Sequence, residues 1–81
     1  MKVLYFAWVR ERIGVPGEEV TTSATTVSEL IDELSAREER YASAFADLTA
    51  VRVAVDQTLV PLDTSIENAR EVAFFPPMTG G

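Results

Sequence analysis

The sequence predicts a single α+β domain in which a mixed sheet of about five strands curls around one helix. Short runs of strand length stand at both ends of the chain, and the middle holds one well-delimited amphipathic helix. The length of 81 residues suits one small core. Because the helix can cover only one face of the sheet, the sheet should curl around it. We expect the first and last strands to be parallel neighbours in the middle of this sheet.

Residues 2–9 are β-prone and predict the first strand. Alternation divides them into two apolar faces: Val3, Tyr5, Ala7 and Val9 on one side, and Leu4, Phe6 and Trp8 on the other. The following Gly14-Val15-Pro16-Gly17 has strong turn chemistry, because proline presets φ and glycine permits positive φ. Glu18 to Thr22 then predicts a returning strand, so the first two strands should form a hairpin.

A capping box predicts that the main helix starts after Thr26. The Thr26 hydroxyl can accept from the third helical N–H, and Glu29 can reach back toward the cap. The apolar positions recur at helical spacing: Val27, Leu30, Ile31 and Leu34. After a charged interval at 37–40 the same spacing returns at Tyr41, Phe45 and Leu48, which predicts a second short helical segment. Whether it continues the first helix or stands apart is left open.

The C-terminal third predicts a second hairpin and a final strand. Val51 to Val55 alternates, Asp56-Gln57 suits a tight connection, and residues 58–60 return before Pro61 ends the strand. A polar connection anchored by Ile66 follows. Residues 71–75 form the last strand, with Val72 and Phe74 inward and Ala73 and Phe75 outward.

The sheet face away from the helix is predicted to be apolar, which is unusual for an exposed face. Phe6 and Phe75 should belong to one patch there, of the kind that marks an association surface. We expect a binding partner to cover this face of the sheet. The alternatives are that the second helical segment covers it or that a second copy of the chain does.

Composition excludes several function classes. A net charge of −6 with only seven basic residues argues against nucleic acid. The chain has no cysteine and no histidine, which removes thiolate nucleophiles, the usual general base and most metal sites. No run is long enough to span a membrane, and we expect a cytoplasmic location. Chemistry must therefore use carboxyl groups, hydroxyls, amines or the chain ends.

The last six residues have the composition of a projecting arm. Pro76 and Pro77 cannot donate ladder hydrogen bonds and favour an extended conformation, so the sheet should stop before them. From Pro76 to Gly81 such an arm reaches roughly 18–20 Å. Gly80 and Gly81 lack side chains, as a narrow channel enclosing the backbone would require.

Three blocks carry a family resemblance: KVLYFAWVRERIG, VAVDQTLV and EVAFFPPMTGG. Through them the chain resembles the small subunits of molybdopterin synthase, which are sulfur carriers with the ubiquitin-like β-grasp fold. The resemblance runs nearly end to end, and its last block is highly specific. It implies a β-grasp domain over residues 1–75 and a flexible Gly-Gly tail over residues 76–81.

The resemblance also implies a chemistry for the tail. An ATP-dependent activating enzyme similar to the ubiquitin-activating class would adenylate Gly81, and a persulfide donor would convert it to a thiocarboxylate. The large subunit would bind cyclic pyranopterin monophosphate and receive the sulfur, one from each of two loaded carriers, to form the dithiolene of molybdopterin. The chain would bind no cofactor itself and would donate sulfur without catalysing, in a heterotetramer whose catalytic groups lie in the large subunit.

The resemblance assigns roles to individual residues. Gly81 is the reactive residue, with Gly80 beside it, and Arg10 is a polar contact at the rim of the interface. The residues of the arm are Pro76, Pro77, Met78 and Thr79. The docking residues are Phe6, Leu59 and Phe75.

Three other functions remain open for a chain with this tail. A ubiquitin-like modifier would join Gly81 to target lysines, and a carrier of the thiamine-pathway type would load the same group with sulfur. The third is a non-covalent adaptor with an inert tail. The FFPP block and the acidic, lysine-poor body favour the molybdopterin assignment.

Overall fold

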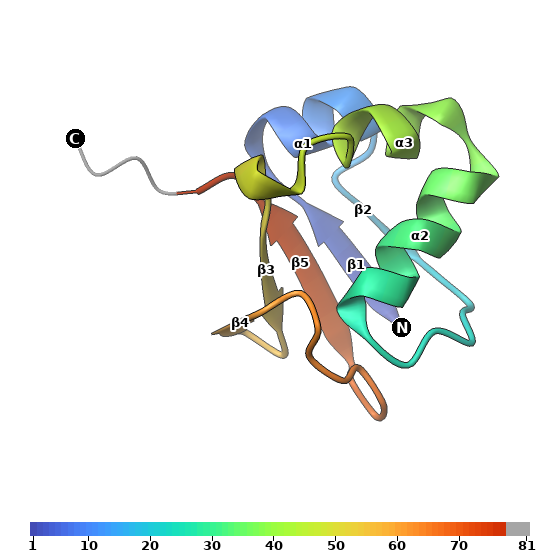
Figure 1. The fold of residues 1–81 in the computed structure, drawn as a ribbon, viewed down its shortest axis with the longest axis vertical. Coiled ribbons are helices and arrows are strands. Elements are labelled where there is room, and N and C mark those ends of the chain that lie inside the picture. The colour runs from blue at the N-terminus through green and yellow to red at the C-terminus, as the bar shows by residue number, and fades with distance from the viewer. Residues whose placement is uncertain (78–81) are drawn as a thin grey trace.

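The computed structural model describes residues 1–77, which form a five-stranded sheet with three α-helices and one short 3₁₀ helix (Figure 1). The elements follow one another as β1 (Lys2–Tyr5), α1 (Ala7–Ile13), β2 (Gly17–Glu19), α2 (Val27–Arg37), α3 (Glu39–Ala44), η1 (Leu48–Ala50), β3 (Arg52–Val55), β4 (Thr58–Val60) and β5 (Glu71–Phe75).

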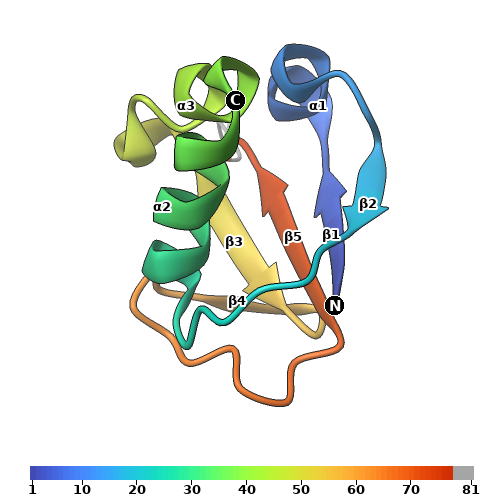
Figure 2. The ribbon, with the colours of Figure 1, turned by 90° about the vertical axis from the view of Figure 1, so that its right-hand side faces the viewer.

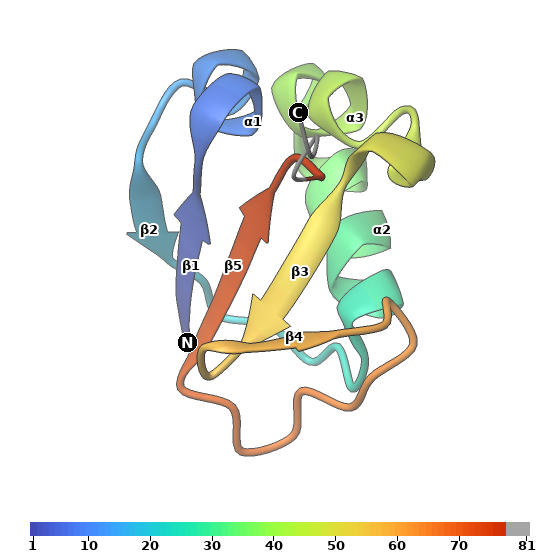
Figure 3. The same ribbon diagram turned by 90° about the vertical axis from the view of Figure 1, so that its left-hand side faces the viewer.

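The sheet confirms the predicted mixed topology. Its strand order is β2-β1-β5-β3-β4, and β1 and β5 are parallel neighbours in the middle. The other three pairs are antiparallel. Seen from its outer side, the sheet stands in front with α2 behind it, and no helix crosses the near side (Figure 3).

Helix α2 covers the inner face of the sheet, and its start was correctly predicted (Figure 2). The Thr26 side chain accepts a hydrogen bond from the Glu29 amide at 3.2 Å. The Glu29 carboxylate reaches back to Thr25, accepting from its amide at 2.7 Å and its hydroxyl at 2.6 Å. The four apolar positions of this helix are fully or almost fully buried. Capping and burial together fix where α2 lies.

The core lies between α2, α1, α3 and the inner face of the sheet. Its largest fully buried side chains are Tyr5, Phe74, Ile13, Leu30, Leu34, Val3, Val9, Val27, Val51, Val53 and Val72. Phe74 is the aromatic centre, stacked with Tyr5 at 6.2 Å between ring centroids and edge-on to Phe45 at 5.0 Å. Aromatic pairs of this geometry stabilise beyond the area they bury. Phe74, the residue before the last residue of β5, is therefore held in the core by Tyr5 and Phe45.

The expectation that the first strand runs to Val9 is wrong. The strand ends at Tyr5, Phe6 is the extended cap residue, and Ala7 with φ 52° turns the chain into α1. Val9 and Ile13 are one helical turn apart and both are buried. The helix ends at Gly14, whose left-handed conformation (φ 97°) and bond to the Arg10 carbonyl form a C-cap.

Three further expectations for this part of the chain differ from the structure. Trp8 lies on α1 instead of the outer sheet face, with the Arg12 guanidinium 5.3 Å from its ring centre. Strands β1 and β2 pair antiparallel as predicted, but α1 and a loop connect them where a tight turn was expected. Strand β2 itself spans only Gly17–Glu19, where a strand over residues 18–22 was expected.

The second helical segment is a separate helix. Glu38, in an extended conformation, ends α2 and starts α3, which packs against α2 and α1. Tyr41 and Phe45 are buried as their spacing predicts, but Leu48 begins η1 and is 38% exposed. Because α3 lies at the end of the sheet, it does not cover the outer face, and that alternative is wrong (Figure 3).

The second hairpin follows its prediction closely. Asp56 and Gln57 both have positive φ, as a two-residue hairpin turn requires. The Asp56 carboxylate accepts from the amides of Arg70 and Glu71 at 2.9 and 3.0 Å, which ties the turn to the start of β5. Ile66 is buried, as expected for the anchor of the long connection.

A hydrogen-bonded cluster joins α3 to β1 and β2. The hydroxyls of Tyr5 and Tyr41 donate to the same Glu18 oxygen at 2.8 and 2.7 Å, and Arg40 donates to the Tyr41 hydroxyl at 3.1 Å. Burial, followed by the hydrogen bond to Glu18 and its negative charge, raises the pKa of Tyr41 to about 12. The same causes raise the pKa of Tyr5.

These pKa shifts predict a loss of stability at alkaline pH. The unfolded chain gives up its phenolic protons near pH 10.0, whereas folded Tyr41 holds its proton to about pH 12. Protonated Tyr41 therefore makes its full contribution to the free energy of unfolding below about pH 10.0. This contribution is lost as the pH rises toward about 12. Urea unfolding across this range measures it. Tyr41→Phe should flatten the loss, and a wild-type free energy of unfolding that stays constant over this range would contradict it.

Candidate functional site

The outer face of the sheet is organised in rows that run across the strands. Strand register places five residues side by side in the middle row: Gly17, Leu4, Ala73, Ala54 and Leu59. A Cβ on Gly17 would stand only 2.8 Å from a Leu4 methyl carbon, so glycine lets this side chain lie flat against β2. The row is apolar from one edge of the sheet to the other.

Aromatic side chains dominate the next row, at the end of the sheet where β5 stops. The Phe6 amide donates to the Phe74 carbonyl at 3.0 Å, which continues the β1–β5 ladder and sets Phe6 beside the end of β5. Phe75 is half-buried, and Phe6 is 46% exposed. Arg52 stands directly opposite Phe75 in the antiparallel β3–β5 pair. We call the two rows together the outer apolar face.

The structure brings the three predicted docking residues onto this face. Phe6 and Phe75 occupy its tail end, as the alternation predicts. Leu59 lies on the edge strand β4 in the middle row and is 65% exposed, the largest value among the exposed large hydrophobic residues of the described chain. Exposed apolar side chains gathered on one face are typical of an association surface.

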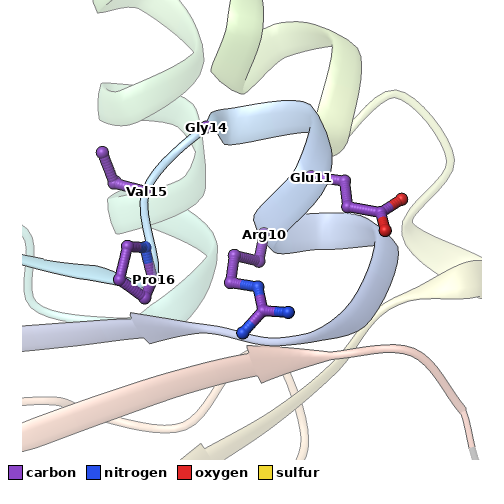
Figure 4. A pocket seen from close by; sticks show the side chains of 5 residues that line it. All are labelled: Arg10, Glu11, Gly14, Val15 and Pro16. Atoms are coloured by element: carbon purple, nitrogen blue, oxygen red, sulfur yellow. The ribbon is translucent and has the colours of Figure 1, made fainter.

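Arg10 lies on α1, one turn after Phe6, where its amide bonds to the Phe6 carbonyl. It lines a shallow pocket of about 490 Å³ with Glu11, Gly14, Val15 and Pro16. Its side chain extends from α1 in the direction of β1, whereas the Glu11 side chain points sideways, away from Arg10 (Figure 4). The predicted rim residue is thus near the tail end of the outer apolar face.

The described part of the arm begins as predicted. Strand β5 ends at Phe75, and Pro76 and Pro77 follow outside any strand and are half-buried. The remaining predicted site residues, Met78, Thr79, Gly80 and Gly81, lie outside the described residues. The chain leaves the sheet next to Phe6 and Arg52 (Figure 1).

Residues 1–77 contain no cluster of acidic side chains placed to hold a metal ion, and no helix in this range is long and apolar enough to cross a membrane. The two carboxyl groups whose pKa is lowered, Glu29 and Asp47, lie at the starts of helices. Hydrogen bonds from Thr25 lower the pKa of Glu29, and those from Thr49 lower the pKa of Asp47. Glu29 therefore takes part in the capping of α2, and Asp47 in the capping of η1.

Sequence reasoning missed two features of this site. The apolar middle row depends on register between strands far apart in the chain, which a single sequence does not give. The position of Arg52 beside Phe75 was not foreseen. The only signal was its alternation with the buried Val51 and Val53.

Comparison with known proteins now identifies the family. The model of the ThiS family matches residues 3–81. The chain belongs to this family. Three curated relatives, each named molybdopterin synthase sulfur carrier subunit, match all of this chain. The one from Escherichia coli is 44% identical over 81 residues and the one from Haemophilus influenzae 37% over 81, both covered to 99%. The Mycobacterium tuberculosis relative is 37% identical over 83 residues and covered to 96%.

Solved structures of similar proteins confirm the ubiquitin-like β-grasp fold of this ThiS family member. SAMP1 from Haloferax volcanii superposes with a TM-score of 0.77 over 100% of this chain and 98% of its own, at 23% identity. A Pyrococcus furiosus protein assigned as molybdopterin converting factor, subunit 1, superposes with a TM-score of 0.72 at 31% identity, covering 95% of both chains. The first likeness concerns the fold alone.

Proposed function

We propose that the chain is a sulfur carrier subunit of molybdopterin synthase. The observation that carries this proposal is the end-to-end match to three proteins of that name at 37–44% identity. Support comes from the outer apolar face, which ends where the chain leaves the sheet toward its Gly-Gly terminus. A carrier needs both a surface for docking and an end that can be loaded.

The outer apolar face is the docking surface in this proposal, and the large subunit of molybdopterin synthase is its partner. Leu59, Phe6 and Phe75 supply exposed apolar area, and association that buries such area is driven by the hydrophobic effect. Pro76 and Pro77 then direct the arm away from the sheet. An arm reaching roughly 18–20 Å can enter a pocket of the partner while the domain stays outside.

Gly81 is the group that carries sulfur. An ATP-dependent activating enzyme joins its carboxylate to AMP and releases pyrophosphate. The terminal sulfur of a persulfide attacks the acyl carbonyl, AMP leaves, and a thiol cleaves the sulfur–sulfur bond to leave a thiocarboxylate. This sulfur is ionised near neutral pH and is a good nucleophile. ATP is consumed by the activating enzyme and is not bound by this chain. Because this step needs ATP, the proposal places the chain in the cytoplasm.

The division of labour follows from the composition. The sequence lacks histidine, the most frequent general acid–base residue, and in this proposal the large subunit supplies the acid–base groups and holds the cyclic pyranopterin monophosphate. The carrier contributes proximity, because docking turns sulfur delivery into a reaction within one complex. Each dithiolene takes two sulfurs, and therefore two loaded carriers.

Mass spectrometry separates this function from that of a protein modifier. Chain produced in cells with the activating pathway should gain the mass difference of one oxygen replaced by one sulfur, located in the C-terminal peptide. Isopeptide adducts on lysines of other proteins, without this mass gain, would instead identify a modifier. A chain that stays unmodified in the presence of the pathway would be an inert adaptor.

Deleting Gly81 should abolish sulfur transfer without changing stability. The shortened chain lacks the residue at which loading is proposed, while the core formed by residues 1–75 remains complete. Transfer is measured as conversion of cyclic pyranopterin monophosphate in the reconstituted synthase, and folding as the free energy of unfolding. A truncated chain that supports normal conversion would contradict the role of Gly81.

Substituting Phe75 with Asp should weaken binding to the large subunit by about 2 kcal/mol or more, because it places an unpaired charge in an apolar contact. Titration calorimetry with the large subunit measures the change. Ala36→Asp is the matched control. Ala36 is exposed on α2, on the opposite side of the sheet, and its substitution by Asp adds the same charge as Phe75→Asp. Equal affinities of the two variants would place Phe75 outside the interface.

A further inference from the structure

Within residues 1–77, the two arginines at the tail end of the outer apolar face have no carboxylate partner. The ion pairs within residues 1–77 are Met1–Glu19, Arg37–Glu33 and Arg40–Glu38. Arg10 and Arg52 belong to none of them, although the chain has 13 acidic residues and a net charge of −6. Glu11, the acidic neighbour of Arg10, points away from it (Figure 4). Among the described residues, positive charge is therefore left uncompensated where the arm leaves the sheet.

Arg52 is held in place by the backbone. Its Nη1 donates to the carbonyls of Thr49 and Val51 at 3.2 and 3.1 Å, at the end of η1. Both of these bonds use Nη1, and Arg52 is an exposed residue, so its other guanidinium N–H groups remain for a binding partner. A guanidinium held this way loses less conformational entropy when it binds a carboxylate, which it can contact through two parallel hydrogen bonds.

The row of the sheet beyond the outer apolar face, on the other side of the middle row, has the opposite charge. Strand register puts Glu19 and Glu71 on either side of Lys2, and the Asp56 turn follows beside Glu71. Acidic residues outnumber basic ones in that row. The outer side of the sheet thus runs from an acidic row, through the apolar middle row, to the basic tail end. A solvated surface that merely kept the protein soluble would not need this polarity.

We infer that Arg52 extends the rim already expected at Arg10, and that this cationic rim selects a partner presenting a carboxylate beside the entrance for the arm. This inference rests on the proposed function and specifies its docking site. The partner surface is an apolar patch bordered by at least one Asp or Glu opposite Arg52. Charge complementarity at a rim mainly sets specificity, orientation and association rate, so the rim would fix which way round the domain docks.

Charge reversal at position 52 tests this rim. The probe is the molybdopterin synthase large subunit of the same organism, titrated at low and at high salt. Arg52→Glu should bind about 10-fold or more weaker than wild type at low salt, and the gap should narrow at high salt because rim charges are screened. Arg52→Lys should fall in between, since it keeps the charge but not the fork.

Arg70→Glu is the matched control, because Arg70 is an exposed arginine in the loop beside Asp56, at the other end of the sheet. It should bind as wild type does. An Asp→Lys or Glu→Lys change on the large subunit that restores binding of Arg52→Glu would identify the partner carboxylate. Thermal unfolding of each variant checks that the domain stays folded.

The outcomes separate this inference from the proposed function. If Phe75→Asp weakens binding and Arg52→Glu does not, the rim is wrong while the docking face stands. If Arg52→Glu and Arg70→Glu weaken binding equally, only net charge matters and the rim is again wrong. If wild-type chain does not bind the large subunit at all, the proposed function fails and the rim fails with it.

Discussion

The parallel pairing of β1 with β5 is the constraint on which the rest of this structure depends. It places the two ends of the domain sequence side by side in the middle of the sheet. On the inner side it sets Tyr5 against Phe74, the stacked pair at the centre of the core. On the outer side it brings Phe6 next to the end of β5. One ladder therefore anchors the core and fixes where the arm departs.

This arrangement separates folding from chemistry. The residues that stabilise the domain are buried around Phe74, whereas the proposed reactive group lies six residues beyond the last strand residue, at Gly81. A body without histidine or cysteine has few groups that could react with an activated acyl end. The single lysine, Lys2, stands at the opposite end of β1 from Phe6. In the proposed function the domain therefore positions the tail, and the reactivity of the tail depends on what the partners supply.

Much of the fold could be predicted because its signals are local. The Thr26 cap, the apolar stripe of α2 and the Asp56-Gln57 turn each depend on residues close together in sequence, and all three are confirmed. Helix α1 was missed because its first three residues, Ala7, Trp8 and Val9, continue the β-prone run of the first strand without a Gly or Pro between them. The cap at Gly14 and the spacing of Val9 and Ile13 were the available signals, and they were outweighed by β-propensity.

The candidate site was predictable only in part, for a physical reason. Alternation alone placed Phe6 and Phe75 on the outer side, and resemblance to the sulfur carriers added Leu59 and Arg10. The position of Arg52 opposite Phe75, and the row joining Leu4 to Leu59, follow from the register of strands that are distant in the chain. Register is set by the packing of the whole sheet, so no short stretch of sequence carries it.

The central claim is that the docked domain delivers a loaded chain end at a fixed distance, and changing the length of the arm tests it most directly. Semisynthetic thiocarboxylates of the wild-type chain and of a chain lacking Met78 and Thr79 would keep the outer apolar face, the two prolines and the glycines identical. Single-turnover sulfur transfer is then measured with saturating large subunit. The account predicts a fall of about 100-fold or more for the short arm, because the sulfur no longer reaches the substrate. Transfer at the wild-type rate would contradict it.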